Sequence, residues 1–133
     1  MEKKDLKPAG VFKYFEEICQ VPRPSKKEEK MIAYLKAFGA KHNLETKVDE
    51  AGNVLIKKPA TPGKENLQTV VLQSHIDMVC EKNNDVQHDF LTDPIETEID
   101  GEWLKAKGTT LGADNGIGVA TELAILADDN IEH

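Results

Sequence analysis

Apolar residues recur with the period of an α-helix after Pro8. Val11, Phe15 and Ile18 follow the spacing i, i+4, i+7, which is typical of a helix with one buried face. The stretch 21–24 contains two prolines, which cannot continue a helix because they lack the backbone N–H. This pattern predicts a first helix that ends near residue 20.

A second apolar stripe predicts a second helix, which fades near residue 42. Ser25 and Glu28 have the S-x-x-E spacing of a capping box, so we expect this helix to begin at Ser25. Its apolar face comprises Met31, Ile32, Leu35 and Phe38.

Three later segments have strand patterns. Alternating residues on both sides of the turn 51–53 predict a hairpin over 44–56, and Asp100-Gly101 predicts a second hairpin between 95 and 104. The apolar run 69–74 predicts a buried central strand, and 81–94 reads as a long loop. A largely apolar helix follows, over about 117–127. This order of elements predicts an α/β sandwich.

Composition narrows the function classes. Acidic residues outnumber basic ones by 24 to 17, a formal charge of −7, with no basic stripe. We therefore expect neither nucleic acid nor an anionic membrane as a partner. No apolar run reaches the length of about 20 residues that spans a bilayer, and the first residues lead into no secretory signal. Cys19 and Cys80 lie far apart with no CxxC pairing, which favours reduced thiols and a cytoplasmic location.

The first candidate site follows the apolar run. His75 and Asp77 are two residues apart, so both side chains point to one face of an extended chain. A neutral imidazole can bind zinc, and a neighbouring carboxylate can fix its tautomer. Taken alone, the H-x-D triplet is more often structural, with a hydrogen-bonded histidine and an aspartate that caps a turn.

The second candidate site is the glycine-rich stretch 108–118. It lacks the Lys-Ser/Thr pair of a P-loop, and Thr121 stands where a dinucleotide fingerprint starting at Gly116 needs its last glycine. Phosphate binding is therefore not indicated. Asp114 remains, at the start of an apolar helix, where the helix dipole favours the ionised carboxylate that a metal requires. Taken alone, an ordinary helix N-cap is the better interpretation.

Together, the segments 74–79 and 112–118 resemble the first two signature motifs of co-catalytic zinc aminopeptidases and dipeptidases. The similarity is greatest to the aminoacyl-histidine dipeptidase (Xaa-His dipeptidase, peptidase D) family. Residues 18–25 resemble the N-terminal helix junction of that family, and 88–95 resemble its linking segment.

The resemblance implies a fold, a function and residue roles. The fold is an incomplete three-layer α/β sandwich of the zinc-peptidase type with a central mixed sheet. His75 would ligate one zinc and Asp114 would bridge two, with cobalt or manganese as other possible metals. Asp77 would take part in catalysis by orienting His75, and the peptide bond Asp114–Asn115 would be cis.

The family site also requires a Glu-Glu pair, a further aspartate and a distant histidine, all downstream. The only Glu-Glu pairs, at 16–17 and 28–29, precede His75 and read as solvated helix charge. We therefore expect residues 1–133 to be the N-terminal part of a catalytic domain, without the rest of that domain or the lid domain. That lid would capture substrate or join two subunits.

The leading hypothesis is hydrolysis of short peptides, namely Xaa-His dipeptides, by the full-length protein, with residues 1–133 alone inactive. Another co-catalytic zinc aminopeptidase or deacylase of the same superfamily is the nearest alternative. A non-catalytic α/β binding module, recognising a metal or a protein partner, is the third.

Overall fold

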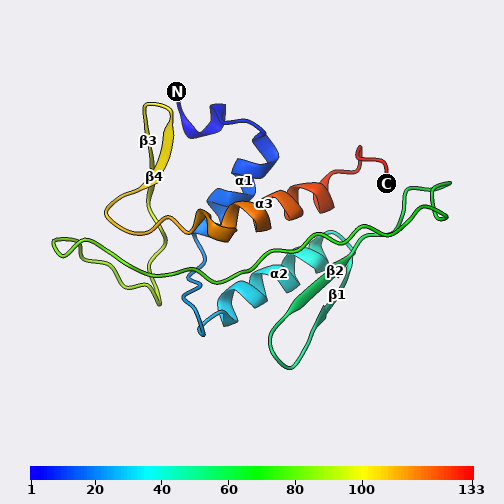
Figure 1. Ribbon diagram of the computed structural model, residues 1–133, viewed down its shortest axis with the longest axis horizontal. Helices are drawn as coiled ribbons and strands as arrows, with labels where there is room; N and C mark the ends of the chain where they lie inside the picture. Colours follow the sequence, from blue (N-terminus) through cyan, green and yellow to red (C-terminus); the bar gives the residue numbers. More distant parts are fainter.

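The computed structural model describes all residues from 1 to 133, with helices and two small hairpins arranged around one apolar core (Figure 1). The elements are the 3₁₀ helix η1 (Lys3–Asp5), α1 (Ala9–Cys19), α2 (Glu29–Lys41), β1 (Glu45–Val48), β2 (Val54–Lys57), β3 (Thr97–Asp100), β4 (Trp103–Ala106) and α3 (Ala113–Ala127).

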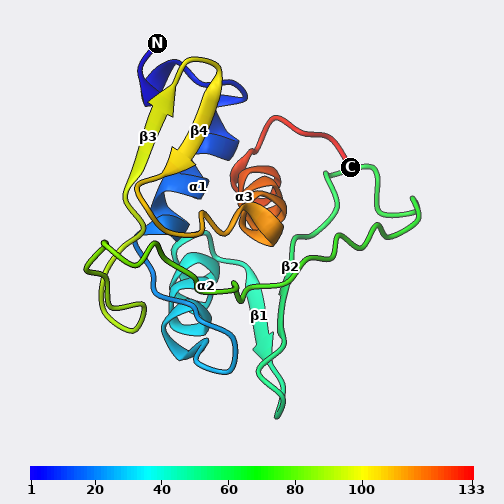
Figure 2. The same cartoon turned by 60° about the vertical axis from the view of Figure 1, so that its left-hand side comes forward.

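The core lies where α1 and α3 pack against each other, with α2 beside them (Figures 1 and 2). Phe15 and Ile18 of α1 and Met31 of α2 are its largest fully buried side chains. Val119 and Leu123 add the buried face of α3. The predicted apolar faces of the first two helices are therefore confirmed, apart from Val11 and Ile32, which are only half-buried.

The predicted start of the second helix is wrong. α2 begins at Glu29, and the Ser25 hydroxyl donates to the Asp77 carboxylate instead of capping the helix. The Glu28 carboxylate accepts a hydrogen bond from the Lys26 backbone N–H at 2.7 Å. The capping-box spacing is present, but the Ser25 hydroxyl hydrogen bonds to Asp77, which is distant in sequence, and not to the start of the helix.

Both predicted hairpins are confirmed. β1 pairs antiparallel with β2, and β3 pairs antiparallel with β4 across the turn that contains Gly101 at φ +61°. The two hairpins form two separate sheets and lie on opposite sides of the helices in both views (Figures 1 and 2).

The predicted central strand and the sheet around it are wrong. Residues 69–74 belong to no strand, and Val70, Val71 and Leu72 are 77%, 77% and 51% exposed. A buried strand needs hydrogen-bonding neighbours on its edges, whereas each hairpin of this chain pairs only with itself. The chain is therefore a mixed α/β arrangement of three helices and two antiparallel hairpins, not a three-layer sandwich with a central mixed sheet.

The exposed segment has a defined path nonetheless. It crosses the molecule between α2 and α3 and delivers residues 75–78 to the beginning of α3 (Figure 1). Met78, at its end, is buried and hydrogen bonds to the backbone of Arg23. None of the helices combines the length and apolar character needed to cross a membrane.

Candidate functional site

The structure brings together the three side chains that the sequence singled out. His75 Nδ1 lies 2.9 Å from Asp77 Oδ1, and His75 Nε2 lies 2.9 Å from Asp114 Oδ1. The imidazole thus stands between two carboxylates that come from different parts of the chain. We call His75, Asp77 and Asp114 the HDD cluster.

Local backbone geometry explains this arrangement. His75 and Asp77 alternate along an extended segment and so share one face. Asp114 lies in the first turn of α3, after Gly112 at φ +76°. The peptide bond between Asp114 and Asn115 is cis, as predicted, and the Asn115 Oδ1 atom accepts the Gly118 backbone N–H at 3.1 Å.

Hydrogen bonds shift the pKa values of two members of the cluster, His75 and Asp77. The bond to Asp114, assisted by Asp77, raises the pKa of His75 above its usual value. The hydrogen bond from the Ser25 hydroxyl, assisted by His75, lowers the pKa of the Asp77 carboxyl. The Asp114 side chain is 96% exposed and that of His75 is 50% exposed, so the cluster opens directly to solvent.

Two residues that the sequence analysis did not assign to the site support the HDD cluster. Arg23 is only 2% exposed and donates to the backbone carbonyls of Ile76, Asp77 and Gly112. Ser25 donates to Asp77 Oδ2 at 2.5 Å. Two features of the sequence distinguish Arg23: it is the single arginine of the chain, and it lies between two prolines.

Neither Glu-Glu pair hydrogen bonds to the HDD cluster, and the pair 16–17 is half-buried rather than fully solvated. Glu16 accepts the Thr97 hydroxyl at 2.6 Å and Glu17 accepts the Tyr34 hydroxyl at 2.7 Å, so both hold helix α1 to its neighbours.

The cluster fits a metal in the kind of its donors but not in their number. An imidazole nitrogen and a carboxylate oxygen that face each other are zinc-type ligands. However, no group of three or more histidine, cysteine, aspartate and glutamate side chains in residues 1–133 is placed to hold a metal ion. A zinc site needs at least three protein ligands, so this chain contributes at most part of one.

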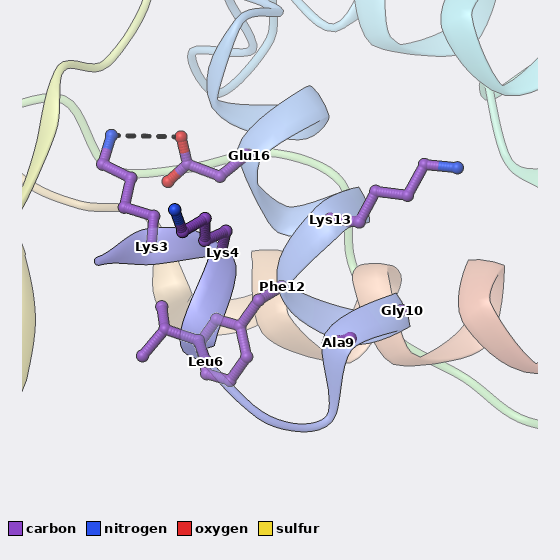
Figure 3. Close-up of a pocket in the computed structure, with 8 residues that line it drawn as sticks. All are labelled: Lys3, Lys4, Leu6, Ala9, Gly10, Phe12, Lys13 and Glu16. Carbon is purple, nitrogen blue, oxygen red and sulfur yellow. Dashed lines mark hydrogen bonds and ion pairs between the residues drawn. The ribbon is translucent and has the colours of Figure 1, made fainter. Parts of the chain in front are cut away.

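A separate cavity of about 410 Å³ lies between η1 and α1 and shares no residue with the HDD cluster. Figure 3 shows Leu6 and Phe12 side by side in its wall and the ion pair of Lys3 with Glu16 at its rim, at 3.2 Å. Three lysines and Glu16 line the cavity beside this apolar wall.

Comparison with known proteins agrees with the resemblance seen in the sequence. No protein-family model matches the chain. It is 52% identical over 132 residues to the cytosol non-specific dipeptidase of Escherichia coli (strain K12), which covers 99% of this chain and 27% of that protein. The crystal structure of aminoacylhistidine dipeptidase from Vibrio alginolyticus superposes with a TM-score of 0.96 at 53% identity, over all of this chain and 27% of that one.

A tripeptidase from Staphylococcus aureus shares the fold alone, with a TM-score of 0.70 at 21% identity over 88% of this chain and 31% of that one. The chain thus spans about a quarter of the length of the first two relatives. Over that quarter the resemblance read from residues 74–79 and 112–118 is confirmed, and the chain corresponds throughout to a segment of aminoacylhistidine and cytosol non-specific dipeptidases.

Proposed function

We propose that the HDD cluster is part of the active site of a zinc-dependent dipeptidase. The observation that carries the proposal is the facing pair of His75 Nε2 and Asp114 Oδ1, 2.9 Å apart, in a chain 52% identical to a dipeptidase. In this proposal His75 and Asp114 would hold zinc, and residues 1–133 would form the N-terminal part of the catalytic domain. The remaining ligands and the general base come from polypeptide outside this chain.

Each residue then has a defined task. Zinc, when bound, supplies a Lewis acid for the scissile carbonyl and for water. His75 would present Nε2 to zinc after losing the proton that it shares with Asp114, while Asp77 would accept the proton on Nδ1 and so favour the tautomer whose Nε2 can bind a metal. Asp114 turns its exposed carboxylate toward Nε2. The Ser25 hydroxyl donates to the second oxygen of Asp77 and so helps to hold the carboxylate beside His75.

The names of the relatives guide the remaining proposals. We propose unblocked short peptides as substrates, Xaa-His dipeptides among them, and a cytosolic location. Homodimerisation would use a lid domain that residues 1–133 do not include. A non-catalytic binding module is the competing function, and the incomplete ligand set is the observation that favours it.

Hydrolysis of β-alanyl-histidine tests the proposal. We expect a longer polypeptide that carries this sequence to be active with zinc and inactive after chelation, and residues 1–133 alone to be inactive. His75→Ala should abolish activity, and Asp77→Ala should lower it by about 10- to 100-fold, as for other residues that orient a metal ligand. Asp85→Ala, an exposed loop carboxylate, is the matched control.

Two results would contradict the proposal. Activity that survives both the chelator and His75→Ala would exclude a metal role for the cluster. Zinc-dependent turnover by residues 1–133 alone would show that the missing ligands and base are in this chain after all.

A further inference from the structure

Arg23 makes an unusual set of contacts for a buried charge. Its Nη1 donates to the carbonyl oxygens of Ile76 and Asp77 at 3.2 and 3.1 Å, and its Nη2 donates to the carbonyl oxygen of Gly112 at 2.7 Å. These three acceptors are backbone groups, so no substitution of their side chains can remove them. Burial of a guanidinium is costly unless its donors are satisfied, and these bonds offset that cost.

The three carbonyls belong to the two segments that carry the HDD cluster. Ile76 and Asp77 adjoin His75, and Gly112 precedes Asp114 by two residues. No backbone–backbone hydrogen bond joins residues 75–77 to residues 112–116. Arg23 therefore provides a hydrogen-bonded link between these segments that does not pass through the His75 and Asp114 side chains.

The surrounding sequence is adapted to this guanidinium. An added Cβ at Gly112 or at Gly116 would lie 2.6 Å from Arg23 Nη2, so glycine at both positions leaves room for it. This gives a role to the glycine-rich stretch, in which we found no phosphate-binding pattern. All other basic side chains are lysines, which lack the planar fork of donors that can reach several carbonyls at once.

We propose that Arg23 is a positioning residue of the candidate site. Its guanidinium holds the segment 75–77 against the start of α3, and this contact sets His75 Nε2 opposite Asp114 Oδ1. Its consequence for catalysis rests on the proposed function, whereas its geometric content does not. The Arg23 side chain hydrogen bonds to neither of the two facing side chains, and all three of its hydrogen bonds go to backbone carbonyls.

Nuclear magnetic resonance of residues 1–133 tests the geometry directly. In the native chain we expect a nuclear Overhauser effect between the His75 ring CH protons and the Asp114 β-protons. We expect Arg23→Met to lose it, because the carbonyls lose their donor, and Arg23→Lys to weaken it. Lys27→Met, which removes an exposed charge from the same loop, is the control and should keep it. The melting temperature of each variant shows whether it is folded.

The outcomes separate positioning from stability. An Overhauser effect that persists in folded Arg23→Met would overturn the proposal, because Arg23 would then stabilise the fold without setting the cluster. If the variants do not fold, the NMR signals of the Arg23 guanidinium in the unsubstituted chain test the proposal instead. Separate Nη resonances that exchange slowly with water would support the positioning role of Arg23. A guanidinium that rotates freely and exchanges rapidly would overturn it.

Activity of the longer polypeptide provides a second readout. Arg23→Lys should lower kcat by about 100-fold with KM nearly unchanged, since misplacing a catalytic group by about 1 Å has effects of this size and Arg23 is buried away from solvent. A rise in KM alone would contradict positioning. If the native polypeptide is inactive while the Overhauser effect depends on Arg23, the proposed function fails and the geometric inference stands.

Discussion

At the scale of single residues, Gly112 combines two constraints. Its φ of +76° lies in the left-handed region, and an added Cβ would lie 2.6 Å from Arg23 Nη2 and 2.9 Å from Met78 Sδ. We expect Gly112→Ala to lower the free energy of unfolding by about 1–2 kcal/mol for the backbone and by about 1–3 kcal/mol more for overpacking.

Gly63 is the matched control for that substitution. Its φ is +90°, but an added Cβ would meet nothing within 4 Å, so Gly63→Ala has the backbone cost alone. Urea denaturation of both variants measures the difference. If both variants lose the same free energy of unfolding, the space beside the Arg23 guanidinium tolerates a methyl group.

The residues of the site differ in how far the sequence could predict them. His75 and Asp77 are two apart, so the period of an extended chain places them on one face. Arg23 acts on carbonyls 53, 54 and 89 residues away, and Ser25 acts on a carboxylate 52 residues away. Periodicity describes only local neighbours, so it contains no signal for such contacts. The metal-binding roles of His75 and Asp114 remain predictions.

At the scale of elements, two helical glycines predict opposite effects of one substitution. A Cβ added at Gly10 of α1 would lie 3.5 Å from the Ala124 Cβ, an ordinary contact, so Gly10→Ala should stabilise the chain by up to about 1 kcal/mol. At Gly39 of α2 the same Cβ would overlap the Thr46 side chain of β1. Gly39→Ala should therefore destabilise the chain by about 1–3 kcal/mol. Thermal unfolding should show melting temperatures that shift in opposite directions. Two increases would mean that helix propensity outweighs packing at Gly39, and two decreases would mean that packing outweighs helix propensity at Gly10.

Elements were predictable to the extent that their bonds are local. α1, α2 and both hairpins close their hydrogen bonds within a short stretch, so period and turn residues were enough to find them. The run 69–74 has the composition of a buried strand, but a strand exists only with a partner, and no segment of this chain pairs with it. The apolar composition of the run 69–74 indicates that it favours burial, but it does not show which segment would pair with it.

At the scale of the whole molecule, residues 68–75 form a stretch whose backbone groups are unpaired and whose apolar side chains are exposed. They make no backbone–backbone hydrogen bond, and Val70, Val71 and Leu72 are largely exposed. An uncharged, extended segment with free N–H and carbonyl groups is a template for pairing with another chain. The net charge of −7 opposes association between copies, but the segment itself carries no charge before His75.

We therefore expect residues 1–133 to self-associate through this segment at roughly 100 µM, the range in which exposed strands aggregate. Val71→Lys should shift the chain toward the monomer, because a charge in the segment disfavours a second strand. Trp103→Lys is the matched control: Trp103 is 76% exposed, against 77% for Val71, and the substitution adds the same charge to a strand that is already paired along one edge. Sedimentation velocity measures both. Each variant changes the net charge from −7 to about −6, so net charge alone would favour association equally in both. If both variants dissociate equally, the segment is not the contact; if only Val71→Lys dissociates, the unpaired segment is the contact.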